Sequence, residues 1–229
     1  MTKILQLPAY LFKIIAFKSE IDRLLLLSVL FSTFLLVARV FYTGSSYFLS
    51  LEWNLFLAFV PYYLSGWLHR KPERITNKWT LSLVLAVWIL FIPNSFYIIT
   101  DLFHLGETGH VPLWYDLLLL LSFAWNGLMM GILSVRQMEK IMQVYYFNKH
   151  ELLFIYPVMW LNALGVFIGR YWRFNSWDVV TNPFRLILDI LDLIMHPLTY
   201  KNAFGMIFCF SVFMTLLYLT IKRVSKMIW

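Results

Sequence analysis

The chain has 229 residues, of which 61% are hydrophobic and only 14% are charged, and its mean hydropathy is +0.71. Soluble domains are about half apolar and about a quarter charged, so this composition excludes an ordinary water-soluble fold. The net charge of +7 does not indicate a nucleic-acid partner, because no basic stripe or recognition motif accompanies it. The single cysteine, Cys209, excludes an intrachain disulfide and a cysteine metal cluster.

The chain begins with a basic segment that contains Lys3, Lys13 and Lys18. No cleavage site of small residues follows the first apolar run, so we do not expect a cleaved signal peptide. Interspersed basic and apolar residues are typical of a helix that lies on the membrane surface. The sequence therefore predicts two parts: an interfacial N-terminal segment, residues 1–23, and a single transmembrane helical bundle, residues 24–229.

Six apolar stretches follow, and a bilayer core needs about 20 apolar residues for each helical crossing. They are Leu24–Tyr42, Leu51–Leu68, Trp79–Thr100, Leu113–Val135, Leu152–Trp172 and Ala203–Ile221. The second is weakened by Glu52, Asn54 and Pro61. The third carries Pro93 beside Asn94, which predicts a kink or an early unwinding. The fold class that we expect is all-α, a polytopic bundle of about six transmembrane helices.

Lysine and arginine are distributed unevenly between these stretches. They cluster in the N-terminal segment, in the second and fourth loops and at the C-terminus, whereas the loops 43–51 and 101–112 have none. Cytoplasmic loops carry the excess of Lys and Arg in membrane proteins. We therefore expect a multi-pass protein of the cytoplasmic membrane, with both termini in the cytoplasm and the odd-numbered loops outside.

The fifth loop, residues 170–202, is basic although the same rule places it outside. Its middle is mostly apolar, and Arg185, Asp189, Asp192 and His196 recur at the spacing of one helix face. This pattern predicts an interfacial or re-entrant helix near 183–196. The four polar residues have two interpretations: ion pairs on the wet face of that helix, or an inward stripe that adds Asp189 or His196 to an external site.

A first polar group lies at the predicted outer face, around the third loop. Asp101 and His104 share a helix face, and Glu107, His110 and Asp116 follow them. Three interpretations fit these residues. They could ligate a divalent metal ion; Asp101, His104 and Asp116 could perform acid–base catalysis; or the carboxylates and imidazoles simply face water. The spacing does not match H-E-x-x-H, so no metal is assigned.

A second polar group follows the fifth stretch and contains Arg170, Arg173, Asn175 and Asp178. On a helix Arg170 and Arg173 point the same way, and paired guanidiniums bind phosphate or carboxylate. At that depth the available anion is a lipid phosphate. The alternative is that both arginines are interfacial anchors, with Asp178 paired to Arg173.

Two asparagines lie within the apolar stretches, Asn94 in the third and Asn126 in the fourth. Polar residues at membrane depth usually face the bundle interior and mark sites. Asn94 could instead satisfy backbone groups next to Pro93. We include both asparagines among the candidate substrate-binding residues.

Several strings resemble a known family. Trp53–Pro61, Phe91–Tyr97, Thr100–Leu105 and Arg173–Asp178 are similar to the bacterial membrane proteins grouped as domain of unknown function 1361, and the likeness covers residues 35–220. The resemblance implies a polytopic protein of the bacterial cytoplasmic membrane. It implies no activity, so it assigns no catalytic residues.

Three functions are compatible with these observations. The leading hypothesis is an outer-face site that binds an anionic lipid or lipid-linked substrate, acting as a hydrolase or transferase. The second is a transporter of a small solute or ion, which predicts a polar path past Asn126 and Asn162. The third is an assembly partner of another membrane protein, which predicts a lipid-facing seam of small residues such as Gly127 with Gly131 or Gly165 with Gly169.

Overall fold

A computed structural model describes residues 20–107, 111–146 and 151–227, and within these ranges the chain is helical and contains no strand. This confirms the all-α prediction. Of the predicted interfacial segment 1–23, only residues 20–23 are described, and they begin the first helix. The elements in chain order are α2 (Glu20–Thr43), the 3-10 helix η1 (Tyr47–Leu49), α3 (Ser50–His69), α4 (Pro72–Thr76), α5 (Lys78–Tyr97), the 3-10 helix η2 (Ile98–His104), α6 (Leu113–Tyr146), α7 (Glu151–Tyr171), α8 (Asp178–Thr181), α9 (Pro183–Met195) and α10 (Lys201–Met227).

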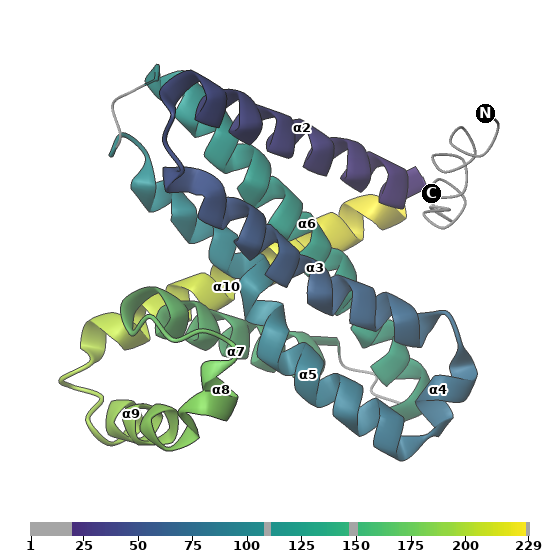
Figure 1. Cartoon of the computed structure of the whole chain (residues 1–229). Coiled ribbons are helices and arrows are strands. Elements are labelled where there is room, and N and C mark those ends of the chain that lie inside the picture. Colours follow the sequence, from purple (N-terminus) through teal and green to yellow (C-terminus); the bar gives the residue numbers. More distant parts are fainter. Residues whose placement is uncertain (1–19, 108–110, 147–150, 228–229) are drawn as a thin grey trace.

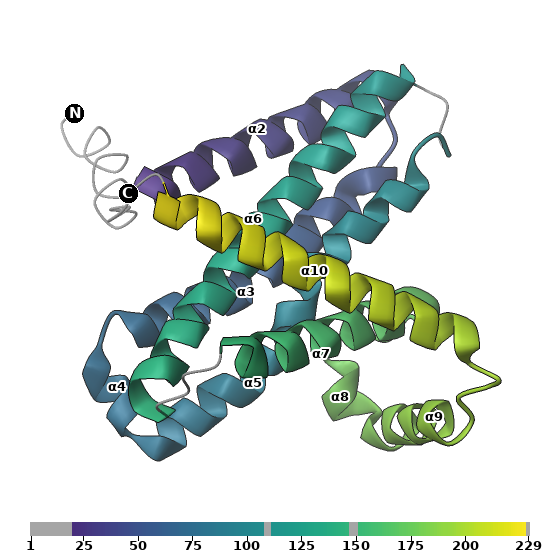
Figure 2. The same cartoon turned by 180° about the vertical axis from the view of Figure 1, so that it is seen from behind.

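The long helices run back and forth across the molecule (Figure 1). The start of α2 and the end of α10 lie on the same side, at the right of Figure 1, together with α4. The connections α2–α3, η2–α6 and α7–α10 lie on the opposite side. Seen from behind, α10 crosses α6 (Figure 2). The alternating direction agrees with a multi-pass arrangement in which the odd-numbered loops share one side.

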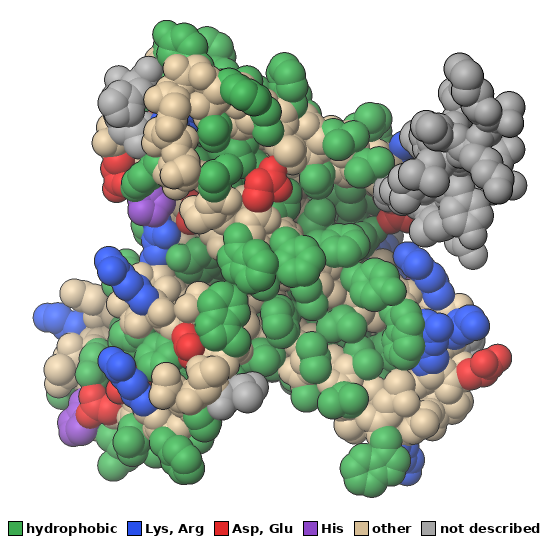
Figure 3. Space-filling view, viewed as in Figure 1, with side chains coloured by type: hydrophobic (Ala, Val, Ile, Leu, Met, Phe, Trp, Pro, Cys, Tyr) green, Lys and Arg blue, Asp and Glu red, His purple; other side chains and the backbone are tan. Residues whose placement is uncertain are grey.

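Among the described residues, five helical stretches are long and apolar enough to cross a membrane. They are Glu20–Thr43, Lys78–His104, Leu113–Gln143, Leu152–Tyr171 and Lys201–Ser225. The remaining predicted crossing corresponds to α3, which has 20 residues but is not among the five. Large hydrophobic areas cover the middle of the surface, as Figure 3 shows, and Lys and Arg side chains lie toward both sides of the view, among them a group near α4. The chain is therefore a multi-pass membrane protein.

Polar residues give α3 its lower hydropathy. Hydrogen bonds inside the bundle explain how such residues are tolerated there. Asn54 donates to Asp101 at 3.0 Å, and Ser65 bonds Ser134 of α6 at 2.9 Å. Ser134 also reaches the carbonyl oxygen of Pro61 at 2.8 Å. Polar groups remote from water are stable when their hydrogen bonds are satisfied internally. Asn54 and Ser65 of α3 thus pair with η2 and α6, whereas the buried Oε1 of Glu52 has no hydrogen-bond partner among the described residues.

Close packing holds α5 between α6 and α7. A Cβ atom on Gly127 would come within 2.8 Å of Ile98, and one on Gly165 within 2.6 Å of Pro93. Gly131 and Gly169 likewise face Ser95 and Tyr97, so both small-residue pairs are internal and not a lipid-facing seam. α5 continues through Pro93 to Tyr97 and changes to a 3-10 helix at Ile98. The predicted early unwinding at Pro93 is therefore wrong: the helix continues past the proline and tightens into a 3-10 helix five residues later.

Two buried ion pairs join α6 to other helices. Arg39 of α2 lies 2.7 Å from Asp116, and Lys222 of α10 lies 2.6 Å from Glu139. Tyr218 donates a further hydrogen bond to Glu139. Charges in a low-dielectric interior are tolerated when they are paired and hydrogen-bonded. The pairing explains why these charged residues occur inside apolar helices, and no ligand site is needed to explain them.

The helix predicted near 183–196 is α9, with 13 residues. At about 1.5 Å per residue it is too short to cross a core of about 30 Å, so it is not a further span. Arg185 pairs with Asp189 at 3.9 Å and Asp192 with His196 at 2.8 Å, which are the i,i+4 pairs expected for a wet face. None of these four residues lines either of the two pockets described below.

Candidate functional site

The 3-10 helix η2 positions the first functional side chains. Residues at i and i+3 of a 3-10 helix lie directly above one another, so Asp101 and His104 share a face. Both line a pocket of about 340 Å³. Its other walls come from η1, α3, α5 and α7, and we call it the polar pocket. Its lining residues are Tyr47, Phe48, Ser50, Leu51, Asn54, Tyr97, Asp101, His104 and Arg170.

Arg170, in the last turn of α7, extends across to η2. Its Nη1 lies 3.3 Å from Asp101 Oδ1, and its Nη2 donates to the carbonyl oxygen of Thr100 at 2.7 Å. Nη2 also donates to His104 Nε2 at 2.9 Å. The side chains of Arg170 and Asp101 are only 14% and 8% exposed. The guanidinium is therefore held in one orientation at the wall of the polar pocket.

His104 connects Arg170 to a carboxylate at the rim. Its Nδ1 lies 2.8 Å from Glu107 Oε2, which also accepts a hydrogen bond from the Tyr47 hydroxyl at 2.5 Å. A guanidinium can only donate, so Nε2 must accept, and the proton of the neutral ring then sits on Nδ1. The hydrogen bonds from Tyr47 and His104 lower the pKa of Glu107, and the bond to Glu107 raises the pKa of Tyr47.

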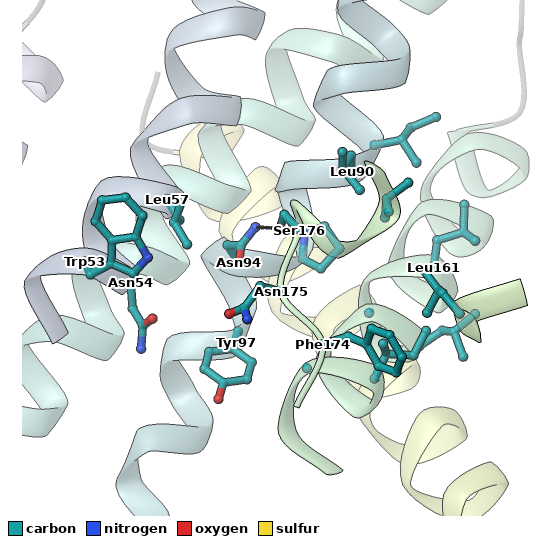
Figure 4. A pocket seen from close by; sticks show the side chains of 18 residues that line it. Trp53, Asn54, Leu57, Leu90, Asn94, Tyr97, Leu161, Phe174, Asn175 and Ser176 are labelled. Carbon is teal, nitrogen blue, oxygen red and sulfur yellow. Dashed lines mark hydrogen bonds between the residues drawn. The ribbon is translucent and has the colours of Figure 1, made fainter. Parts of the chain in front are cut away.

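A second pocket, of about 270 Å³, lies between α3, α5 and α7 (Figure 4). We call it the apolar pocket, because most of its lining residues are hydrophobic. It is lined by Trp53, Asn54, Leu57, Ile89, Leu90, Pro93, Asn94, Tyr97, Leu161, Leu164, Gly165, Ile168, Gly169, Phe174, Asn175, Ser176, Val179 and Leu186. At its centre Asn94 donates to Ser176 at 2.9 Å, as the dashed line in Figure 4 marks.

The two pockets adjoin, since Asn54 and Tyr97 line both of them. The exposed residues at the mouth of the apolar pocket are Trp53, Ile89 and Leu161, together with Asn175 and Val179. Ile89 and Leu161 lie in membrane-spanning helices, so part of this mouth lies on the surface that faces lipid, whereas Asn175 and Val179 follow the end of α7. The two pockets thus meet at Asn54 and Tyr97, and Arg170 and His104 line the polar one.

The residues of the second predicted polar group do not form one site. α7 ends at Tyr171, and Arg173 lies beyond it with a left-handed φ of 57°, so the two arginines do not share a helix face. Arg173 is exposed and lines neither pocket. Asn175 does line the apolar pocket. Asp178 accepts from the Asn175 backbone N–H at 2.6 Å and so shapes the turn before α8.

Two further predicted residues lie away from both pockets. Asp116 is buried against Arg39, and Asn126 donates to Ser32 of α2 at 2.8 Å. Asn94, in contrast, both lines the apolar pocket and donates to the Phe91 carbonyl oxygen next to Pro93. Within the described ranges no three His, Cys, Asp or Glu side chains gather closely enough to hold a metal ion. His110, a candidate ligand in the sequence, lies outside those ranges.

Several wall residues were not among the predicted site residues. Tyr47, Ser50 and Tyr97 carry no pattern that separates them from the many aromatic and hydroxyl residues near predicted span ends. The sequence showed Asn54 only as a polar residue that weakens the second apolar stretch. Its hydrogen bond to Asp101 at the polar pocket explains why a polar residue stands in this stretch.

Comparison with known proteins gives one family. No curated protein and no solved structure matches the chain. A family model described as "Protein of unknown function (DUF1361)" matches residues 53–217. The matched residues contain α5, η2 and α7. They include every lining residue of the polar pocket except Tyr47, Phe48, Ser50 and Leu51. This match covers most of the chain and confirms the resemblance drawn from the sequence strings. The chain is therefore a member of the DUF1361 family of proteins of unknown function.

Proposed function

We propose that this membrane protein binds a lipid or lipid-linked molecule that carries a phosphate, with its apolar chain in the apolar pocket and its headgroup in the polar pocket. The observation that carries the proposal is that a mostly apolar pocket and a polar pocket adjoin, with Asn54 and Tyr97 as shared walls. Ligand sites typically combine an apolar wall with a few converging polar groups. An amphiphile is the ligand class that matches both halves.

The apolar pocket suits a hydrocarbon chain. Leu57, Leu164 and Ile168 contribute aliphatic walls, and part of the mouth lies on the lipid-facing surface. Burial of hydrocarbon in such a pocket exchanges lipid contacts for protein contacts, so affinity has to come mainly from the headgroup. The polar pocket is the part that would decide which lipid stays bound.

Arg170 is the group that would bind the phosphate. A guanidinium donates charge-assisted hydrogen bonds to phosphate oxygens, and Asp101 and Thr100 already fix the orientation of this one. Low exposure strengthens such charge interactions. A phosphate that accepts from Nη2 would take the place of His104 Nε2 in that hydrogen bond.

Acid–base chemistry is a second candidate function, favoured by the His104–Glu107 pair. A carboxylate that holds Nδ1–H orients an imidazole so that Nε2 can accept a proton. If the bound phosphate displaced His104 from Arg170, Nε2 would be free for this role. The chain would then be a hydrolase or transferase acting on the headgroup.

We also propose that the polar pocket opens toward the extracytoplasmic side. The loops 43–51 and 101–112 beside it lack Lys and Arg, whereas Arg70, Lys71 and Arg74 lie at the other end of the bundle. With this orientation both termini are cytoplasmic, and the membrane is the cytoplasmic membrane.

The alternative functions have less support. A transporter predicts a polar path along Asn126 and Asn162, and neither residue lines one of the two pockets. An assembly partner predicts a lipid-facing seam of small residues, and the pairs that begin at Gly127 and Gly165 pack against η2 and α5 instead.

Lipid retention tests the proposal. The protein is purified in mild detergent, and co-purified lipids are quantified by mass spectrometry for the wild type, Arg170→Gln and Leu164→Trp. Arg170→Gln removes the guanidinium and Leu164→Trp fills the apolar pocket, so both should retain less lipid. Arg173→Gln, which removes an exposed arginine outside the pockets, is the matched control and should retain the wild-type amount.

Size-exclusion profiles establish that each variant is folded before its lipids are compared. Equal lipid content in all four proteins would contradict the proposal. Loss in Arg170→Gln but not in Leu164→Trp would restrict the site to the polar pocket.

A further inference from the structure

The charges of the polar pocket do not match a simple anion. Among the described residues that line it, Arg170 is the one permanent cation, and Asp101 already forms an ion pair with it. Glu107 is not a lining residue, but it lies next to the pocket as a second carboxylate, bonded to the lining residues Tyr47 and His104. His104 is the neutral Nδ1–H tautomer in this network. Two carboxylates against one guanidinium leave one negative charge in excess.

A headgroup that is only anionic would add to that excess. Like charges that lie close together repel, although the exposure of Glu107 to water weakens this repulsion. A headgroup that brings a cation along with its phosphate would instead balance Glu107. The pocket therefore favours a ligand with separate negative and positive ends over a phosphate alone.

The geometry offers one position for each end. Arg170 lies inside the pocket, and Glu107, with its side chain 48% exposed, lies at the rim. Only the imidazole of His104 separates them, bonded to Arg170 at 2.9 Å and to Glu107 at 2.8 Å. One headgroup with a short linker can reach both. The hydrogen bonds from Tyr47 and His104 both end on Oε2 of Glu107, and Oε1 has no hydrogen bond to any residue that the structure describes.

We propose that the polar pocket selects a phosphodiester lipid whose headgroup carries a primary ammonium group, as phosphatidylethanolamine does. The phosphate binds Arg170, and the ammonium donates to Oε1 of Glu107. This inference rests on the proposed function, because it specifies the headgroup of the same bound lipid. An N–H donor is required at Glu107, so a trimethylated ammonium is a poorer fit.

A competition experiment with the full-length protein in detergent tests this selectivity. A phosphatidylethanolamine labelled with a fluorophore on its acyl chain is bound first, and its displacement is followed by fluorescence anisotropy. The competitors are the dioctanoyl forms of phosphatidylethanolamine, phosphatidylcholine, phosphatidylglycerol and phosphatidic acid. We expect phosphatidylethanolamine to compete about tenfold better than the others, the effect of one hydrogen bond to a charged group.

Glu107→Gln is the decisive variant. Glu107 is exposed, so its replacement does not threaten the fold, and Glu73→Gln, an exposed acid on α4, is the charge-matched control. Glu107→Gln should weaken phosphatidylethanolamine about tenfold while phosphatidylglycerol binds no more weakly than before. Glu73→Gln should change neither affinity.

Four outcomes would overturn the inference. Phosphatidylglycerol or phosphatidic acid could compete as well as phosphatidylethanolamine in the wild type, or Glu107→Gln could weaken all four competitors equally. Either result contradicts the ammonium contact and leaves lipid binding through Arg170 intact. If no phospholipid displaces the probe, or if Arg170→Gln and Leu164→Trp leave displacement unchanged, the proposed function fails as well.

Discussion

The guanidinium of Arg39 binds the carboxylate of Asp116 through two hydrogen bonds, at 2.7 and 3.3 Å, although 77 residues separate them in sequence. The two side chains are 0% and 3% exposed. The ring of Phe48 lies 4.4 Å from the guanidinium and covers one of its faces. α2 packs mainly on α6, so this pair fixes the C-terminal end of α2 to the rest of the bundle.

Removal of one partner should be far more harmful than removal of both. Asp116→Leu leaves the Arg39 charge buried without its counterion, and we expect a loss of about 3–5 kcal/mol in the free energy of unfolding. The double variant Arg39→Leu with Asp116→Leu should recover most of that loss. Thermal unfolding in detergent, followed by tryptophan fluorescence, measures both. A double variant no more stable than the single one would show that an uncompensated charge is not the cause of the loss.

The contact between Gly165 and Pro93 leaves no room for a side chain. A Cβ at position 165 would lie 2.6 Å from two atoms of the proline ring, so Gly165→Ala should destabilise the protein by about 1–3 kcal/mol. Gly205→Ala on α10 is the matched control, because no atom lies within 4 Å of its Cβ. The control should gain stability, since alanine favours a helix by about 1 kcal/mol. Equal melting temperatures for the two variants would contradict the close packing of α5 on α7.

Glu107 should make the outer loop sensitive to acid. Its pKa is lowered from 4.5 by hydrogen bonds from Tyr47 and His104, so it contributes stability above its unfolded pKa. That contribution is lost as the pH falls through the lowered folded-state pKa. The difference in melting temperature between wild type and Glu107→Gln should therefore be present at neutral pH and vanish in acid. A difference that is constant over the whole pH range would contradict the role of these hydrogen bonds.

Cysteine labelling tests the orientation of the bundle. In a Cys209→Ser background, Ser46→Cys lies on the proposed outer side and Lys71→Cys on the proposed cytoplasmic side, and both positions are exposed. A membrane-impermeant maleimide applied to intact cells should label position 46 and spare position 71. Lysed cells should show labelling at both. The reverse pattern in intact cells would invert the topology and move the polar pocket to the cytoplasmic side.

Hydropathy and charge spacing predicted most of the architecture because they reflect constraints that act locally. The bilayer requires long apolar helices, and the predicted stretch Leu152–Trp172 corresponds to α7, Glu151–Tyr171. The helix near 183–196 followed from i,i+4 spacing, which is also local. The predicted stretch Ala203–Ile221 was shorter than α10, Lys201–Met227, because a helix continues into water after its apolar part ends.

The candidate site was harder to predict, since its members come from different helices. The i,i+3 spacing of Asp101 and His104 on one helix face could be read locally, and Arg170 was singled out because it broke the charge bias. Asp116 has the same local features, an acid near the outer end of a span, and only its distant partner Arg39 distinguishes it. Arg173 was grouped with Arg170 on the assumption that the helix continued, but α7 ends at Tyr171.

The interior hydrogen bonds of α3 have a consequence for biogenesis. Asn54 and Ser65 find their partners in Asp101 and Ser134, which are synthesised 47 and 69 residues later. A nascent α3 therefore meets the bilayer with its amide and hydroxyl groups unsatisfied, and its entry into lipid should wait for the helices that follow. The least hydrophobic of the predicted crossings would then be inserted together with its successors, and truncation after α3 should leave it outside the membrane.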